Sequence, residues 1–336
     1  MPERARPILE TLTAVGGVSL LIVIGKQVQT RFWHASAGRH RTPGDYAAGA
    51  LMALSCALLW ALSYVSLKFV SGHIAAIPLS AGVLGTAAGF LLSGWALARK
   101  LEGPKLAEPA PRRLSARMAL LCLANLGNFG LSIYALYFVS ATQAMTLSNV
   151  SPLFLAALLL VRRKLRLTPG SAVALAVLLL SAWLLTADAS GNVTGDGGSL
   201  VGSLLALAAG ASFALWADIA DDIETRVRSM SSRFGVLASV FSLTFGVAAV
   251  AAWVLGPFPH LSATDAAIIV GNGLRVAVVY VVFQLAVRRG GPLLAVVVAT
   301  LQVPLTLLFE ALLLEVPLEA GLLIGVAAAE IGRAHV

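Results

Sequence analysis

Charged residues are scarce in this chain. Only 12% of its 336 residues are Asp, Glu, Lys or Arg, and 58% are hydrophobic. A typical soluble domain carries about 25% charged residues, so the composition argues against a water-soluble protein. Uncharged runs of about 20 residues follow one another, and each is long enough to cross a hydrocarbon layer ~30 Å thick as a helix. The chain is therefore predicted to be an all-α polytopic membrane protein.

Cysteine is nearly absent, and so are several motifs of enzyme chemistry. Cys56 and Cys122 both lie inside apolar runs, so they offer neither a disulfide framework nor metal-ligand spacing. His73 and His260 fall in predicted loops without a metal-binding pattern. The predicted spans hold no histidine and no pair of aspartates, and the phosphate-binding pattern GxxxxGKS/T is missing. We expect no catalytic residue, no metal and no cofactor, and neither an intramembrane enzyme nor an ATP-driven pump.

The basic residues are distributed unevenly. A net charge of +8 is compatible with nucleic-acid binding, but nineteen of the 24 Lys and Arg residues lie in five short connections, and the alternate connections contain none. By the positive-inside rule, these connections and the N-terminal side of the first bundle helix face the cytoplasm of a cell whose inner (plasma) membrane holds the protein. The expected partners are the lipid bilayer and a small-molecule substrate, with no nucleic acid and with a homodimer left open. The basic connections are Lys26–Tyr46, Arg99–Arg117, Arg162–Arg166, Asp221–Arg233 and Arg288–Gly291.

Ten spans are expected, and the two halves of the chain look alike. Gly49–Leu62 aligns without gaps to Gly202–Leu215, and Ala135–Pro152 corresponds to Ala286–Pro304. Five spans per half is an odd number, so the second repeat is inverted, as in transporters that bind substrate at the repeat interface. The spans lie near Ala48–Val70, Ile77–Leu97, Ala116–Phe138, Ala141–Val161, Ser171–Leu185, Leu200–Ile219, Phe234–Leu255, Ala266–Val287, Pro292–Leu314 and a truncated tenth from Leu318.

The expected domains are two five-helix repeats, at residues 48–190 and 198–330, and two terminal segments. Within residues 1–47, the uncharged run Thr11–Gly25 predicts an extra apolar helix, a cleaved signal peptide or a start codon placed too far upstream. At the other end, the hexapeptide IGRAHV matches one reading frame of a common sequencing adapter. Residues 331–336 are therefore expected to be a non-native tail.

Several short motifs follow one another along the bundle in the same order in both halves. Together they resemble the EamA-like, ten-helix members of the drug/metabolite transporter (DMT) superfamily. The resemblance covers residue 48 to about residue 330, and it implies two inverted five-helix repeats that export or take up small metabolites. The motifs are Leu59–Leu62 running to Lys68, Ala135–Tyr137 with Ser140–Ala141, Pro152–Phe154, Ala286–Gly290, Pro304, and Glu315 before Pro317–Leu318.

The chain departs from the family pattern at three places, one of which is a slightly shorter distance from Pro304 to Glu315. After the fourth span, where family members usually carry a glutamate, it has Arg162, Arg163 and Lys164. The sixth span ends in acidic residues where basic ones are commoner, among them Asp218 and Glu224. These departures affect what the resemblance implies about the substrate rather than about the fold.

Polar residues beside helix-breaking prolines predict a binding site. They precede Pro152 within Tyr134–Leu160, and they precede Pro304 within Leu285–Leu314. Polar groups inside hydrocarbon require partners, so we expect a polar cavity between the third, fourth, eighth and ninth spans, although each residue alone could equally form an interhelical hydrogen bond. The candidate substrate-binding residues are Asn125, Asn128, Thr146, Asn149, Asn272, Arg275, Tyr280, Gln284, Thr300 and Gln302.

Three charged residues at membrane depth are further candidates. Arg275 is expected to pair with an anionic substrate or with Glu310, or else to be structural. Glu310 is a candidate proton-coupling carboxyl, or an acid of the outer vestibule. Lys68 is either a gate or a side chain that snorkels, and Trp60 is interpreted as packing. Because only the second wall, Asn272–Glu310, carries charge, we expect charge recognition and proton coupling in the second half.

These features predict a secondary active transporter, an exporter by preference, that moves a small polar metabolite by alternating access at the repeat interface. The alternative that the sequence leaves open is a membrane scaffold or sensor that transports nothing.

Overall fold

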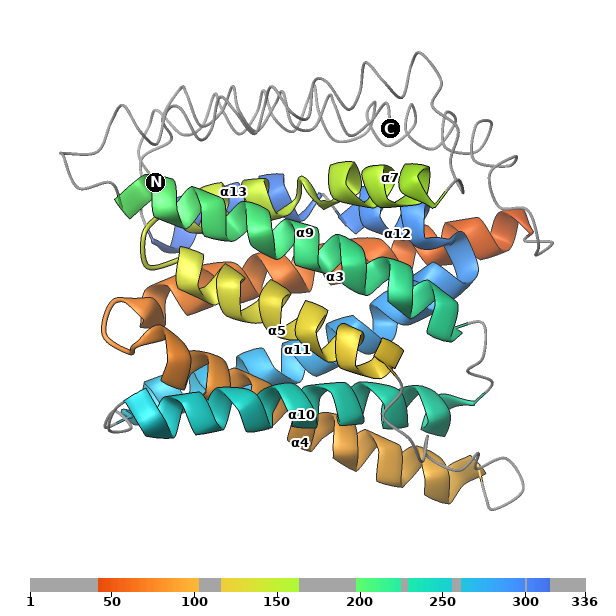
Figure 1. Ribbon diagram of the computed structural model, residues 1–336, viewed down its shortest axis with the longest axis horizontal. Coiled ribbons are helices and arrows are strands. Elements are labelled where there is room, and N and C mark those ends of the chain that lie inside the picture. The colour runs from red at the N-terminus through yellow and green to blue at the C-terminus, as the bar shows by residue number, and fades with distance from the viewer. Residues whose placement is uncertain are drawn as a thin grey trace, which may run out of the picture. The chain divides into compact units, whose positions relative to one another are not determined.

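The computed structural model describes residues 42–102, 116–162, 198–224, 229–255, 261–299 and 301–314, and all the regular structure in these ranges is helical (Figure 1). Helices are expected because a lipid interior offers backbone N–H and C=O groups no partners outside the segment itself. The helices are α3 (Pro43–Ser71), α4 (Ala76–Glu102), α5 (Ala116–Ala135), α6 (Ala141–Ser148), α7 (Ser151–Val161), α9 (Gly198–Glu224), α10 (Met230–Leu255), α11 (Ala263–Gly290), α12 (Pro292–Ala299) and α13 (Gln302–Leu313).

Within the described residues, seven helical segments are long and apolar enough to cross a membrane, which confirms the predicted all-α polytopic fold class. The predicted fifth span, the tenth span and both terminal segments lie outside the described residues. Several helices extend beyond the apolar segments of the sequence. The predicted connection Arg288–Gly291 is wrong in part, because α11 continues to Gly290 and carries Arg288 and Arg289 in its last turn. Basic side chains there face the negative end of the helix dipole, so a polar last turn is favourable.

The fourth and ninth spans are each broken near the middle. Asn149 is the C-cap of α6, Val150 precedes α7, and Pro152 lies in the first turn of α7. Proline has no backbone N–H and is tolerated in a first turn, where that group has no helical partner. Pro304 has the matching place in α13, two residues after Gln302. The predicted helix-breaking role of both prolines therefore agrees with the observed breaks.

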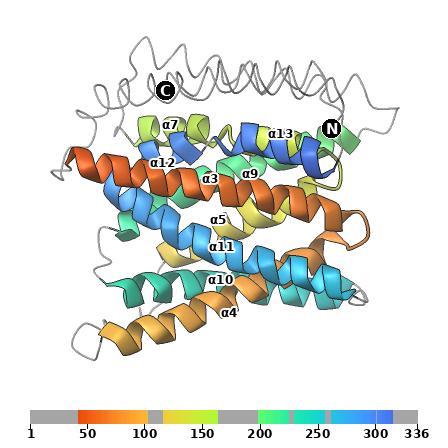
Figure 2. The same cartoon turned by 180° about the vertical axis from the view of Figure 1, so that it is seen from behind.

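The two halves pack in a reciprocal way. In the first half α3 lies against α11, α12 and α13 of the second, while α9 lies against α5, α6 and α7 of the first. The second helices, α4 and α10, pack against each other. Figures 1 and 2 show corresponding helices of the two halves running in opposite directions, with α4 and α10 side by side. This packing is what two inverted repeats require.

Two glycines allow close, reciprocal contacts between the halves. A Cβ atom on Gly49 of α3 would lie 2.7 Å from the Gly290 nitrogen and 3.2 Å from the Ala286 oxygen of α11. On α9, a Cβ atom at Gly202 would lie 2.8 Å from Val139 Cγ1 and 3.4 Å from the Ala135 oxygen. Gly49 and Gly202 are the first residues of the two sequences aligned above, and they make matching contacts in opposite halves.

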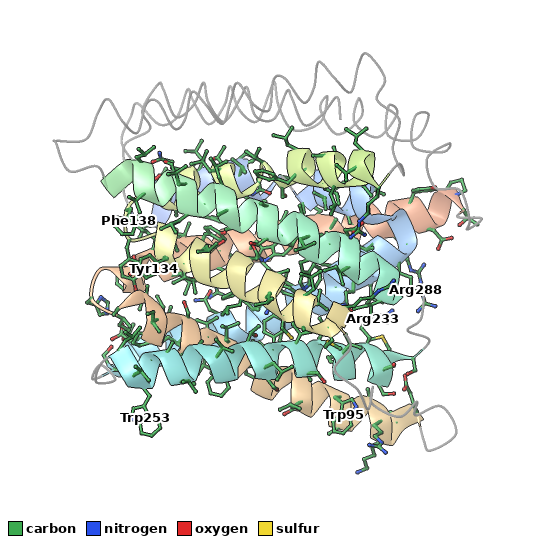
Figure 3. All side chains as sticks on the ribbon, in the orientation of Figure 1. Trp95, Tyr134, Phe138, Arg233, Trp253 and Arg288 are labelled. Atoms are coloured by element: carbon green, nitrogen blue, oxygen red, sulfur yellow. The ribbon has the colours of Figure 1, made fainter. Side chains whose placement is uncertain are left out.

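The two ends of the bundle differ in composition. Figure 3 places Arg233 and Arg288 toward one end and Tyr134, Phe138 and Trp253 toward the other. The side chain of Trp253 is 80% exposed. Exposed aromatic residues near a helix end are typical of the membrane–water interface. The same view shows that the long axes of the helices connect these two ends.

Candidate substrate cavity

A cavity lies between the two sets of helices. Its free volume is about 620 Å³, including the part that is open to solvent. The lining residues come from α3, α5, α6, α9, α11 and α13, so both halves contribute. They are Trp60, Ser63, Tyr64, Leu67, Asn128, Phe129, Ser132, Ile133, Leu136, Met145, Ser148, Asn149, Phe213, Val276 and Gln302. We refer to this space as the central cavity.

Three of the predicted binding residues line the central cavity: Asn128, Asn149 and Gln302. Asn128 comes from α5, and its amide donates to the Tyr280 hydroxyl over 3.0 Å. Asn149 and Gln302 lie at the two helix breaks. The unwound backbone at these breaks therefore faces the same space as the polar side chains, which is where transporter sites are found.

Hydrogen bonds fix the orientation of the Asn149 and Gln302 amides. Asn149 Nδ2 donates to the Met145 carbonyl over 2.8 Å, so Asn149 Oδ1 is the atom left to face Gln302. Gln302 Nε2 donates to that oxygen. A carbonyl oxygen only accepts, so neither amide can be flipped without losing a bond. Gln302 Oε1 is consequently left buried without a hydrogen-bond partner, on a residue that lines the central cavity.

Aromatic rings form part of the lining of the central cavity, which we call its aromatic side. Trp60 and Phe213 both line it, with ring centroids 5.6 Å apart in an edge-to-face arrangement. Trp60 also contacts Phe283, at 5.5 Å between centroids. The prediction that Trp60 serves in packing agrees with these contacts, but the residue also borders the cavity. Packing from behind holds the Trp60 ring in place toward that space.

The other predicted binding residues that the structure describes do not line the central cavity. Asn272 donates to the Ser66 hydroxyl and to the Ile268 carbonyl. Asn125 donates to Thr244, and the Thr146 hydroxyl donates back to Thr142 within its own helix. Tyr280 and Gln284 are buried in α11. Thr300 lies outside the described residues. Interhelical hydrogen bonds, the alternative stated for each residue, are observed for Asn272 and Asn125, whereas the Thr146 bond lies within its own helix.

Arg275 does not contact Glu310. Its guanidinium donates to the Ser66 hydroxyl over 3.1 Å, and within the described part of the chain this is its hydrogen-bond partner. Ser66, Asn272 and Arg275 thus form a polar group where α3 crosses α11. Among the described residues of α11, Val276 borders the central cavity, and it directly follows Arg275 in the sequence. The expected pairing of Arg275 with Glu310 is therefore replaced by a hydroxyl contact to the opposite helix.

Lys68 and Glu310 hold the corner between α5 and α6 from both sides. Lys68 Nζ donates to the carbonyls of Leu136 and Val139, at 2.6 and 2.9 Å, just beyond the C-terminus of α5. The Glu310 carboxylate, 2% exposed, accepts from the backbone nitrogens of Ala141 and Thr142 at 2.9 and 2.7 Å. Each charge meets the helix end of opposite polarity. We call this arrangement the corner clamp.

The corner clamp adjoins the central cavity. Leu67, which precedes Lys68 in the sequence, lines the cavity. Leu136, whose carbonyl accepts from Lys68, also lines it. Lys68 therefore does not extend away from the protein as a snorkelling side chain would, because its ammonium is bound within the bundle.

At the arginine-bearing end, two ion pairs connect helices. Arg162, at the C-terminus of α7, pairs with the buried Asp218 of α9. Arg289 of α11 pairs with Asp45 in the first turn of α3 over 3.3 Å. Arg162 and Asp218 are two of the positions at which the chain departs from the family pattern, and they compensate each other.

Several lining residues were not predicted from the sequence. Ser63, Tyr64 and Leu67 lie one and two turns after Trp60 on the same face of α3, and Ser132 lies one turn after Asn128 on α5. The helical repeat from Asn128 was a usable signal for Ser132, because residues four apart share a face. No comparable signal marks the aromatic residues, which resemble ordinary core residues.

The fold and the site define a multi-pass, all-α membrane protein with an internal cavity between two halves. Residues 47–187 match the EamA-like transporter family. Residues 47–187 thus form an EamA-like transporter domain, consistent with the DMT superfamily, and together with the apolar helices this match points to a transporter of the DMT type. A solved structure described as "Crystal structure of protein" is 20% identical, with a TM-score of 0.62 over 85% of this chain and 94% of that one, which shows the fold alone. Among curated proteins no match is found.

Proposed function

We propose that this protein is a secondary active transporter that exports a small polar metabolite from the cytoplasm by alternating access. The observation that carries the proposal is the central cavity, which both halves line at the breaks of the fourth and ninth spans. A site of this kind can be exposed to either side of the membrane when one half rocks against the other. The proposed location is the inner (plasma) membrane, with the arginine-bearing end in the cytoplasm.

Contacts at the two ends of the bundle support the alternating-access mechanism. On the proposed outer side, the corner clamp joins α3 and α13 to the α5–α6 corner. On the proposed cytoplasmic side, ion pairs join α7 to α9 and α11 to α3. Movement of the halves must break one group of contacts while the other is kept, and short polar contacts between rigid helices suit such a two-state exchange.

Glu310 is the proposed proton-coupling group. As a carboxylate it accepts two hydrogen bonds from the start of α6. Protonation removes the negative charge that these N–H groups and the positive end of the helix dipole stabilise. The corner clamp is therefore weakened when Glu310 takes up a proton, and this step links proton binding to opening of the outer side.

Transport by purified protein in lipid vesicles tests the proposal. Vesicles loaded with pools of amino acids, nucleosides and nucleobases should release at least one solute, with a pH change that follows solute movement. Glu310→Gln should keep solute exchange and lose the coupled proton flux. Glu102→Gln is a matched control, because Glu102 accepts two backbone bonds at the start of α10 in the same way. Absence of flux for every solute would favour the scaffold or sensor instead.

A further inference from the structure

We propose that the central cavity binds an uncharged, planar ring compound that presents an N–H donor to Gln302. This inference rests on the proposed transport function and specifies its substrate class. Three observations carry it: the charge of the lining, the aromatic rings on one side, and the unpartnered oxygen of Gln302.

The described lining of the central cavity contains no Asp, Glu, Lys, Arg or His. Lys68 and Arg275 are next in sequence to the lining residues Leu67 and Val276. Lys68 donates to backbone carbonyls, and Arg275 donates to the Ser66 hydroxyl. A charged group that leaves water needs an opposite charge or several hydrogen bonds to offset its loss of hydration. The described lining offers no opposite charge to a carboxylate or a phosphate, and its hydroxyl and amide groups alone must replace the lost hydration, so it favours an uncharged ligand over an anion. The earlier expectation of charge recognition in the second half does not fit this lining.

The aromatic side of the central cavity suits a flat ring. Trp60, Tyr64, Phe129 and Phe213 line it, and Trp60 is held by its contacts to Phe213 and Phe283. Aromatic rings attract other rings through stacked and edge-to-face contacts that an aliphatic ring cannot make. A planar ligand therefore gains more from this wall than a puckered ring of similar volume.

The Gln302 oxygen supplies the directional contact. Its side-chain nitrogen is committed to Asn149, and its oxygen is buried without a partner. A buried acceptor without a donor is costly, and the Gln302 oxygen has almost no exposed surface in the structure. A ligand N–H therefore removes that cost only when the Gln302 side chain shifts to bring its oxygen to the cavity surface. A ligand of the same shape without an N–H leaves the oxygen unsatisfied. Gln302 is therefore the specificity-determining residue of the cavity.

Competition binding to the purified full chain in lipid nanodiscs tests the substrate class. Equilibrium dialysis with radiolabelled nicotinamide, and with adenine as a larger probe, measures binding without transport. Methyl nicotinate has nearly the same shape but no N–H, nicotinate carries a negative charge, and cyclohexanecarboxamide lacks the flat ring. We expect each competitor to bind about tenfold more weakly than nicotinamide. Nicotinate binding as tightly as nicotinamide, or failure of both nicotinamide and adenine to bind, would overturn the proposal.

A variant pair separates recognition from structural support. Gln302→Met should lower nicotinamide affinity to that of methyl nicotinate, so that the ratio of the two falls from about ten to about one. Gln143→Met, a glutamine of α6 whose amide donates to Ser203 away from the central cavity, should keep the ratio. If Gln302→Met weakens both ligands equally, Gln302 is only a structural residue and the proposal is wrong.

The binding and transport measurements test the substrate class and the transport function separately. Selective binding of nicotinamide together with no flux in vesicles would contradict the transport function and leave the cavity chemistry intact. Flux of a charged solute together with no binding of neutral rings would support transport and contradict the inferred substrate class.

Discussion

At the scale of single residues, Gly49 permits a close approach of α3 to α11. The atoms that a Cβ on Gly49 would meet belong to the backbone of Gly290 and Ala286, at 2.7 to 3.2 Å. Backbone atoms inside a helix cannot move aside as the end of a flexible side chain can. The helix axes must therefore separate if Gly49 is replaced, and packing along the whole contact is lost.

We predict that Gly49→Ala destabilises the protein by about 1–3 kcal/mol, as overpacked cores do. Gly89→Ala is the matched control, because Gly89 lies in the middle of α4 and a Cβ there meets nothing within 4 Å. Alanine is the better helix former by up to about 1 kcal/mol, so this control should leave stability unchanged or raised. Thermal unfolding of both variants in detergent measures the difference. Equal melting temperatures would contradict the close packing.

The same scale shows which site residues a sequence can reveal. Asn128, Asn149 and Gln302 were predicted because amides are costly inside hydrocarbon and so need a partner or a cavity. Asn272 gives the same signal, yet it bonds to Ser66, so the signal does not distinguish a cavity from a helix contact. Trp60 gives no signal of its own, because an aromatic residue is equally at home against lipid, core or ligand.

At the scale of helices, the corner clamp fixes how α5 turns into α6. Helix ends carry unpaired carbonyls or N–H groups, and inside a membrane these need partners from elsewhere. Lys68 provides donors for the end of α5, and Glu310 provides acceptors for the start of α6. Since Lys68 lies on α3 and Glu310 on α13, one contact comes from each half of the chain.

We predict that Glu310→Gln speeds hydrogen exchange at the amides of Ala141 and Thr142 by about tenfold or more, because two hydrogen bonds to a charged acceptor are weakened. Exchange measured by mass spectrometry on protein in nanodiscs reports on these amides directly. Glu102→Gln should instead speed exchange at Met230 and Ser231, where Glu102 accepts, and leave α6 unchanged. Unchanged exchange at Ala141 and Thr142 in Glu310→Gln would mean that the clamp does not hold the corner.

Helix positions were more predictable than helix ends. Hydropathy identified the described spans because a lipid interior enforces long apolar helices. The ends at Glu102 and Glu224 lie five residues beyond the predicted ends at Leu97 and Ile219, because helices continue into the polar interface, which hydropathy does not detect. The two helix breaks were predictable because proline removes an N–H from the helix.

At the scale of the whole molecule, the reciprocal packing follows from repeat alignments that the sequence contains. Gly49 and Gly202 correspond in the alignment, and each contacts the end of a helix from the other half. The boundaries of the two repeats remain a prediction. The chemistry of the site could not be deduced from this symmetry, because Glu310 and Arg275 have no charged equivalents in the first half. Glu310 acts at the corner clamp and Arg275 where α3 crosses α11, so these two charges lie outside the described lining of the cavity.

The orientation of the whole bundle is testable by chemical labelling. Ala75 is exposed in the connection between α3 and α4, at the end opposite the arginines, and Arg288 is exposed in the last turn of α11. With Cys56 and Cys122 replaced by alanine, we predict that a membrane-impermeant maleimide labels Ala75→Cys in intact cells. Arg288→Cys should be labelled only after the cells are made permeable, because basic connections stay in the cytoplasm.

The labelling result also decides which side each group of contacts closes. If Ala75→Cys is the accessible position, the corner clamp lies on the outer side, where protonation of Glu310 responds to the outside pH. If Arg288→Cys is labelled in intact cells instead, the orientation is reversed and the clamp faces the cytoplasm. Proton binding at Glu310 would then favour opening toward the cytoplasm, so the proposed export by this protein depends on the first result.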